Sequence, residues 1–479
     1  MISKLLQHFP EGYTPNPSQV KLLKSIDEAF DTGSKFVVCN APTGSGKSFV
    51  SKTLGNVADD SPDEFRELVT SYAAYKRVQG GYKYQEECDE TAPFGCTALT
   101  ITKALQDQYK ELFDETAVVK GKSNYQCAVD ERFPVDVAPC LHAASLKADC
   151  WAKCKCPYYE ARNEALTAQF NTLNYNMFFA LPNHLKKRQF LICDEASELE
   201  DQLVKEFTCK VDYKFLARMD ITVRVLTKNM SAIKWLSELQ VDLTDKIDDI
   251  KDILATKKTN NKKALLDLTT NMQRLMNLQS KIEQVIDSWD ESEYVFERDH
   301  MGITFMPLKV DKLSHRLFEY ADKVILMSAT IIDPNNFCKS LGITDYKYVE
   351  AESSFDPKKA PIVCNPKYKL NYHTMDKYLP RVIKQVAEIC EHHKGDKGII
   401  HSQNNNITAK LSNMLYGDRF LYREPGIKNE DILDQHVKSS DPTVLVSPSM
   451  SYGVDLKGDL AKFQILIKAP FLTMKDVRI

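Results

Sequence analysis

The residues best suited to chemistry form a short segment that follows an apolar stretch and leads into a helix-compatible one. The segment, Ala41-Pro-Thr-Gly-Ser-Gly-Lys-Ser48, comes directly after residues 35–40. Gly44 and Gly46, which flank Ser45, let backbone amides turn inward around phosphate oxygens, and the following helix adds its N-terminal dipole. Because strand, loop and helix occur in the order that phosphate binding requires, the segment predicts a P-loop. Its first residue is Ala where the strict pattern has Gly.

Charged and hydroxyl side chains complete this candidate site. Lys47 would reach the β- and γ-phosphates of a nucleotide, and Ser48 would coordinate Mg²⁺. A second segment, Phe190-Leu-Ile-Cys-Asp-Glu195, is an apolar run that ends in two carboxylates. Asp194 would hold Mg²⁺ through water, and Glu195 would orient the attacking water as general base. The two segments together predict hydrolysis of a nucleoside triphosphate, but not what the hydrolysis drives.

The elements that must position these residues are those of an α/β protein. Short β-branched apolar runs alternate with helical patterns, which predicts parallel sheets. The clearest strands are residues 35–40, 190–193, 324–327, 398–401, 443–446 and 463–467. Two regions interrupt the alternation, a cysteine-rich one at 120–160 and a helix-like one at 240–290. In the second, apolar residues recur at helical spacing on both sides of a basic stretch, 257–263, which predicts an antiparallel helical hairpin. The pattern alone favours a structural insertion.

Composition and length set outer limits on the chain. Its 479 residues suffice for two to four domains, and 43% hydrophobic with 27% charged residues is typical of a soluble globular protein. No apolar run of about eighteen residues occurs and the N-terminus is polar, so neither a membrane span nor a signal peptide is predicted. The expected location is the cytoplasm. Because the formal net charge is −3, a nucleic-acid partner must be inferred from sites rather than from overall charge.

Cysteines are unevenly distributed. Of 13 in the chain, five lie between Cys127 and Cys156, whereas most of the others occur singly in apolar stretches. In a chain without a secretion signal, such crowding favours a metal or cluster site over disulfides. Thiolates suit both zinc and iron–sulfur clusters, and spacing alone does not choose between them.

Further segments resemble the XPD/DinG group of superfamily 2 DNA helicases. Residues 13–19 look like the adenine-side Q motif, and residues 100–108 look like motif Ia, whose hydroxyl and amide side chains would contact the DNA backbone. Other similarities are Asp194-Glu-Ala-Ser197 to a DEAH box, Ser328-Ala-Thr330 to motif III, 398–402 to motif IV, 449–455 to motif V and 467–471 to the approach to motif VI. The resemblance, from about residue 13 to the end, implies that Gln19, Gly453 and Asp455 join the nucleotide site.

The resemblance also gives the cysteines a role. The family carries a [4Fe–4S] domain between motifs Ia and II, which is where these cysteines lie. Cys127 and Cys156 look like its first and last ligands, with Cys140 and Cys150 the best remaining pair and Cys154 a spare. The helical hairpin matches the family's arch domain, and the arch and cluster domains would form a hole for single-stranded DNA.

The resemblance further predicts how the chain divides. Lysines at 120, 122, 147, 153 and 155 could follow phosphates, and tyrosines at 125, 158 and 159 could stack on bases or simply pack. The expected fold is two RecA-like P-loop motor domains with parallel sheets, the first carrying both insertions. The expected pieces are motor domain 1 at 1–110, 166–205 and 301–345, the cluster domain at 111–165, the arch at 206–300 and motor domain 2 at 346–479.

Four departures from the family stand out. Ser197 replaces the usual His of the DEAH box, Tyr452 replaces a usual Glu in motif V, and Asn16 replaces a usual Arg in the Q motif. The chain as given also stops before a Gln-x-x-Gly-Arg-x-x-Arg motif, whose arginines reach the γ-phosphate. On this basis the second motor domain is expected to be incomplete.

The expected function is that of a monomeric enzyme that hydrolyses ATP with Mg²⁺, moves along single-stranded DNA and unwinds forked duplex, by resemblance in the 5′→3′ direction. DNA repair, replication and recombination would all be compatible with this activity. A non-hydrolysing DNA-binding module is an alternative because the motif VI arginines are missing. A translocase that strips proteins or R-loops without processive unwinding is another. A small-molecule P-loop kinase fits poorly with the second set of motifs.

Overall fold

The chain forms two compact units, Met1–Phe355 and Asp356–Ile479. The computed structural model describes residues 3–70, 91–138, 140, 156–227, 231–256, 262–291, 293–353, 356–359, 361–423, 427, 429–448 and 456–469. The predicted start of motor domain 2, residue 346, falls inside the first unit, because β10 (Lys347–Glu350) pairs with β1 (Phe36–Asn40).

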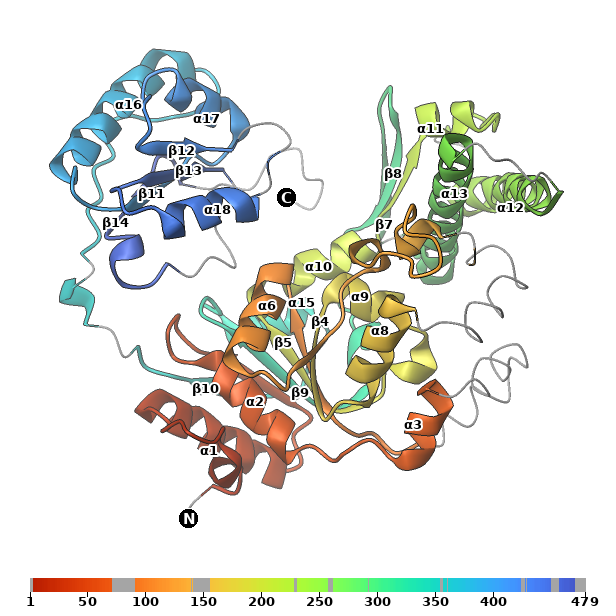
Figure 1. Ribbon diagram of the computed structural model, residues 1–479, viewed down its shortest axis with the longest axis horizontal. Helices are drawn as coiled ribbons and strands as arrows, with labels where there is room; N and C mark the ends of the chain where they lie inside the picture. The colour runs from red at the N-terminus through yellow and green to blue at the C-terminus, as the bar shows by residue number, and fades with distance from the viewer. Residues whose placement is uncertain are drawn as a thin grey trace. The chain divides into compact units, whose positions relative to one another are not determined.

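Unit 1 is built on a seven-stranded parallel sheet (Figure 1). Its strand order is β10-β1-β9-β5-β2-β4-β3. Besides β10 and β1, the sheet contains β9 (Ala321–Ser328), β5 (Arg188–Asp194), β2 (Cys96–Thr100), β4 (Phe170–Asn174) and β3 (Ala117–Val118). The central strands β1, β5 and β9 each contain an uninterrupted apolar run, as a sheet covered on both faces requires. The runs are Phe36–Cys39, Phe190–Cys193 and Val324–Met327. The predicted strands at 35–40, 190–193 and 324–327 are confirmed.

Helices cover both faces of this sheet. On β1, Val37 and Cys39 belong to one buried cluster and Val38 to the other, as the alternation of side chains along a strand dictates. Helices α1 (Pro17–Asp31), α2 (Lys47–Val57) and α6 (Lys103–Leu112) contribute to the first cluster. The second face carries α3 (Asp63–Thr70), α8 (Pro157–Thr167), α9 (Tyr175–Ala180) and α10 (Leu199–Glu206).

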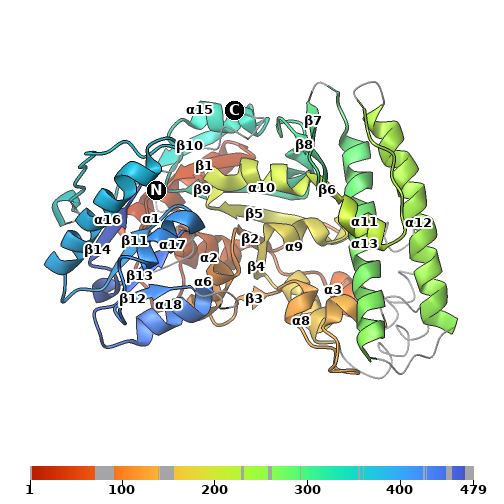
Figure 2. The same cartoon turned by 90° about the horizontal axis from the view of Figure 1, so that it is seen from above.

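The predicted helical hairpin is confirmed as α12 (Ala232–Thr256) and α13 (Lys262–Ser288), which run side by side at one end of unit 1 (Figure 2). Its predicted basic turn lies mostly outside the described residues. The hairpin is joined to a three-stranded antiparallel sheet, order β6-β8-β7, that the sequence did not predict. Its strands are β6 (Cys209–Asp212), β8 (Gly302–Pro307) and β7 (Tyr294–Arg298). Strand β8 thus lies within the segment 301–345 that was assigned to the motor domain.

Unit 2 contains a second, four-stranded parallel sheet of order β12-β13-β11-β14. The strands are β12 (Phe420–Tyr422), β13 (Val444–Ser447), β11 (Gly398–His401) and β14 (Phe463–Leu466). Helices α16 (Met375–His392), α17 (Asn405–Ser412) and α18 (Asn429–Lys438) accompany it. The predicted strands at 398–401, 443–446 and 463–467 are confirmed, and with them the α/β class. No helix among the described residues is both long and apolar enough to cross a lipid bilayer.

Candidate nucleotide-binding site

The P-loop lies where β1 ends and α2 begins, at the carboxyl edge of the first sheet. Ala41 N donates to Ser328 O across 2.8 Å, which ties the start of the loop to the end of the neighbouring strand β9. Gly44 and Gly46 both have positive φ, 77° and 80°, and Gly46 is the residue that caps α2. Open crevices outside the carboxyl ends of parallel strands are where α/β proteins bind ligands. The backbone therefore has the shape of a phosphate cradle.

Two side chains from the start of α1 support this loop from outside. Asn16 and Gln19 form a reciprocal capping box on α1. The same side chains reach the P-loop, since Asn16 Nδ2 donates to Ser45 O and Gln19 Nε2 donates to Gly46 O, each at 3.3 Å. Asn16, where the family usually has Arg, is therefore a helix cap and a brace for the loop. The sequence signal for this cap is an Asn three residues before a Gln at a helix start.

The two acidic residues lie at the end of β5, opposite the P-loop. Lys47 Nζ lies 3.0 Å from Glu195 Oε1, and both side chains are largely shielded from solvent. Glu195 has a positive φ of 51°, so the chain turns sharply there, and its N–H donates to Asp194 Oδ1 across 3.0 Å. Burial raises the pKa of Asp194 to about 6, with the neighbouring Glu195 adding to the rise and Lys47 opposing it.

Ser197 links the acidic residues to motif III. The Ser328 hydroxyl donates to Ser197 Oγ across 2.9 Å, and Thr330 Oγ1 donates to the same oxygen across 3.1 Å. Ser328 Oγ also lies 3.4 Å from Glu195 Oε2. The contact between the DEAH-like box and motif III is therefore made by short hydroxyl side chains, although the usual His is absent.

The motif Ia-like segment is only partly available to a ligand. Thr102 accepts from Leu105 N and so caps α6. Gln106 is fully buried, with its amide donating to Val119 O and Thr172 O, so its side chain is not accessible to a ligand. Lys103 is exposed and donates to Asn124 Oδ1 across 2.8 Å. Gln106 therefore has a structural role and does not supply one of the predicted contacts to the DNA backbone.

The basic and aromatic residues beside the cysteines also have internal partners. Lys120 Nζ lies 2.7 Å from Asp107 Oδ1, and Lys122 Nζ lies 5.5 Å from the centre of the Tyr158 ring. Tyr158 is buried and packs edge-on against Tyr125 and Tyr159. Tyr158 therefore packs in the interior and is not available to stack on a base. The other three lysines, at 147, 153 and 155, lie outside the described residues.

The predicted cluster ligands are only partly described. Cys127 and Cys140 share a small apolar cluster with Phe133 and Val137. Cys156 precedes α8, and both Cys150 and Cys154 lie outside the described residues. Within the described ranges, no group of three or more His, Cys, Asp or Glu side chains is placed to hold a metal ion. Gly453 and Asp455, predicted to join the nucleotide site, also fall outside these ranges.

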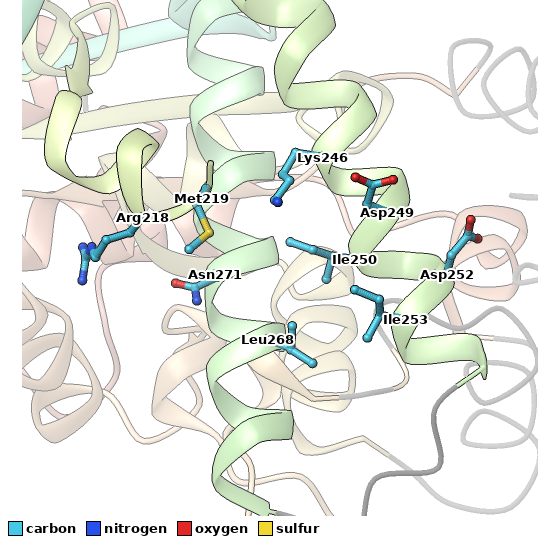
Figure 3. A pocket seen from close by; sticks show the side chains of 9 residues that line it. All are labelled: Arg218, Met219, Lys246, Asp249, Ile250, Asp252, Ile253, Leu268 and Asn271. Carbon is cyan, nitrogen blue, oxygen red and sulfur yellow. The ribbon is translucent and has the colours of Figure 1, made fainter. Parts of the chain in front are cut away.

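A cavity of about 480 Å³ lies in the hairpin region rather than at the P-loop (Figure 3). It is open, has Ile250, Ile253 and Leu268 among its lining residues, and carries both basic and acidic side chains, Lys246 and Asp249 among them. None of its lining residues belongs to the nucleotide site.

Comparisons with known proteins agree with this arrangement. No protein-family model matches the sequence. The chain is 22% identical to the ATP-dependent DNA helicase YoaA of Haemophilus influenzae, over 96% of this chain and 82% of that protein. It is 29% identical to the ATP-dependent DNA helicase DinG of Photobacterium profundum, over 38% of this chain and 28% of that protein.

Solved structures add a likeness of fold. An XPD helicase superposes with a TM-score of 0.55 at 14% identity, covering 95% of this chain and 85% of that one. A structure titled as apo XPD superposes with a TM-score of 0.51 at 12% identity, covering 92% and 81%. The architecture of these proteins, with parallel sheets of the RecA type, is thus also that of this chain.

Proposed function

We propose that this XPD/DinG-like helicase of superfamily 2 hydrolyses ATP with Mg²⁺ to move along single-stranded DNA and to unwind duplex DNA in the 5′→3′ direction. The single observation that carries the proposal is the Lys47–Glu195 pair, which joins a P-loop to a strand-end carboxylate at the edge of a parallel sheet. The relatives named above as ATP-dependent DNA helicases support DNA as the substrate. The direction rests on the resemblance to the family alone.

Each residue of the site has a distinct part in this proposal. Gly44, Ser45 and Gly46 would offer backbone N–H groups to the phosphates, and Lys47 would bind the β- and γ-phosphates. Binding phosphate would draw Lys47 away from Glu195, because the ammonium group would then pair with the phosphate oxygens instead. Glu195 would thereby become able to accept a proton from the attacking water.

The metal side of the site is formed by a hydroxyl and a carboxylate. Ser48, in the first turn of α2, and Asp194, at the end of β5, would hold Mg²⁺, a hard cation that prefers oxygen ligands. The metal would neutralise charge on the phosphate oxygens. Gln19 would lie on the adenine side, and the resemblance to the family also assigns Gly453 and Asp455 to the nucleotide site.

We also propose that Cys127, Cys140, Cys150 and Cys156 bind a [4Fe–4S] cluster. The joint packing of Cys127 and Cys140 in one small apolar cluster supports the first two ligands. The position of the cysteines between the motif Ia-like and DEAH-like segments supports the assignment to iron–sulfur rather than zinc. The cluster would have no part in ATP hydrolysis.

The test is ATP turnover by the chain, with and without single-stranded DNA, together with strand separation on forked duplexes. We expect DNA to stimulate turnover, and unwinding to require a 5′ single-stranded tail on the strand that the enzyme follows. DNA binding without any turnover would support the non-hydrolysing module and contradict the proposal. Turnover with strand movement but no unwinding would indicate a translocase.

A further inference from the structure

Tyr109 is a buried hydroxyl at the nucleotide site that the roles above do not use. It lies on α6 and is 1% exposed, within the apolar cluster that covers one face of the first sheet. Its ring lies 6.0 Å from that of Phe170, centre to centre. A buried tyrosine hydroxyl usually has a hydrogen-bond partner, so the identity of its partners indicates what it does.

The partners of Tyr109 come from α2 and from the end of β5, the two elements that carry the proposed metal ligands. Its hydroxyl lies 3.0 Å from Ser51 Oγ, on α2, and 3.4 Å from Asp194 Oδ2, at the end of β5. One phenol group therefore contacts Asp194, a proposed Mg²⁺ ligand, and α2, the helix that carries the other proposed ligand, Ser48.

The geometry around Asp194 shows what this contact achieves. Asp194 Oδ1 accepts from Glu195 N, and Oδ2 faces Tyr109, so each carboxylate oxygen has one donor. The Tyr109 hydroxyl is the donor in both contacts, and of its two acceptors the Asp194 carboxylate is the charge-assisted one. Ser51 Oγ itself donates to Lys47 O across 3.3 Å. The plane of the carboxylate is thereby held from both ends.

We infer that Tyr109 is a positioning residue for the nucleotide-bound metal, whose hydroxyl orients Asp194 toward Mg²⁺ and ties it to α2, the helix that carries Ser48. Helix α6 begins at Lys103, directly after the motif Ia-like strand end, so Tyr109 also connects that helix to Asp194. The inference rests on the proposed function. A positioning role would affect the binding of Mg²⁺, whereas a packing role would affect nucleotide binding equally with and without the metal.

The two roles predict different binding behaviour in Tyr109→Phe. The ring and its packing against Phe170 are kept, so the variant should fold and its P-loop should bind nucleotide without metal as the parent does. Loss of the hydroxyl leaves Asp194 Oδ2 without its donor. We expect the Mg²⁺ concentration at half-saturation to rise about tenfold, the effect of losing one hydrogen bond to a charged group.

The experiment is a titration of Mg²⁺ into the full chain with a fluorescent ADP analogue, paired with a titration of the analogue in EDTA. Tyr294→Phe is the matched control, because Tyr294 is also buried and its hydroxyl lies 2.9 Å from Ser288 Oγ, remote from the P-loop. A higher Mg²⁺ requirement in Tyr109→Phe alone, with unchanged affinity in EDTA, is the expected result.

Three outcomes would overturn the inference. An unchanged Mg²⁺ requirement in Tyr109→Phe would show that the hydroxyl does not position the metal ligands. Equal weakening with and without Mg²⁺ would show a general structural role. Failure of the parent chain to bind the analogue at all would remove the proposed nucleotide site, and the inference would fall with it.

Discussion

The nucleotide site and the cysteine-rich segment differ in what holds their chemical groups together. At the nucleotide site, parallel pairing places Asn40 beside Ser328 and Asp194 beside Met327, so backbone register brings the reactive strand ends to one edge. In the cysteine-rich segment the described pairing is one bridge, Gln126 to Pro134. Strand pairing therefore positions the nucleotide-site residues before any ligand binds, whereas the cysteine thiolates would depend on the bound cluster to fix their positions.

Removal of a cluster ligand should have the largest effect and should be confined to its own region. Protein purified without oxygen should be brown and contain about four irons per chain. Serine at any one of positions 127, 140, 150 or 156 should abolish colour and iron, because each change removes one thiolate. Nucleotide binding should persist in these variants.

Two controls sharpen that prediction. Cys154→Ser should keep colour and iron, and Cys338→Ser should do so too, because Cys338 is a buried core residue of unit 1. Zinc without iron in the purified protein would contradict the cluster assignment while leaving the nucleotide site untouched. Bleaching by Cys154→Ser with colour retained in Cys150→Ser would move the third ligand to Cys154.

Gly46→Ala should disable the nucleotide site without unfolding the chain. A Cβ at Gly46 would lie 2.0 Å from Gln19 Nε2, and the φ of +80° adds strain of about 1–3 kcal/mol. We expect nucleotide affinity to fall on the order of a hundredfold, about 2.7 kcal/mol. Gly33→Ala is the matched control, because Gly33 has a φ of +84° but nothing within 4 Å of the added Cβ. Equal loss of nucleotide binding in both variants would refute the role of the Gln19 contact.

Asp194→Asn should stabilise the nucleotide-free protein at neutral pH. The pKa of Asp194 rises from 3.8 unfolded to about 6 folded, mainly through burial, so the folded state favours the protonated carboxyl. In the parent, the contribution of Asp194 to the free energy of unfolding is fully present below pH 3.8 and is lost as the pH rises through about 6. The gain in Asp194→Asn should therefore grow with pH to at most about 3 kcal/mol by pH 7.5.

Denaturant unfolding of parent and variant between pH 5 and pH 7.5 measures this difference. Asp418→Asn, a change at an exposed position of unit 2, should be neutral at both pH values. If Asp194→Asn were less stable than the parent at pH 7.5, the carboxylate would be a net stabilising group and this account of its burial would be wrong.

Ser197→Ala should have the smallest effect. It removes the oxygen that accepts from Ser328 and Thr330, at a cost of about 1 kcal/mol. Nucleotide affinity should change by about twofold or less, because Ser197 contacts motif III and not the P-loop. Stimulation of ATP turnover by DNA should fall several-fold, and Ser340→Ala, whose hydroxyl bonds locally to Phe337 O, should be silent. Full stimulation in Ser197→Ala would show that this contact does not couple the two segments.

Much of the fold and of the nucleotide site could be predicted because strong local patterns specify them. The runs before Ala41 and Asp194 are apolar enough to mark central strands, and their order along the chain marks a P-loop protein. By contrast, β10 is a largely exposed edge strand of sequence Lys-Tyr-Val-Glu, with little apolar content to distinguish it. Strand β6 is similarly short, with only two of its four residues buried.

The contacts of Tyr109 and Asn16 could not be predicted for a different reason. Tyr109 meets Asp194 from 85 residues away in sequence, and Asn16 meets Ser45 from 29 residues away. Helix pattern indicates which face of α6 is buried, but only the packed arrangement of α2, α6 and β5 selects the partner of a buried hydroxyl. The sequence likewise indicated a DEAH-like box, whereas the hydroxyl link through Ser197 depends on the pairing of β5 with β9.

The most direct test of the central claim is a filter-binding and phosphate-release assay on Lys47→Ala, Glu195→Gln and the control Lys21→Ala, whose side chain is exposed on α1. The account predicts that Lys47→Ala binds no Mg·ATP, that Glu195→Gln retains Mg·ATP without releasing phosphate, and that Lys21→Ala behaves as the parent. Parental binding by Lys47→Ala, or parental phosphate release by Glu195→Gln, would contradict the assignment of this site to ATP hydrolysis.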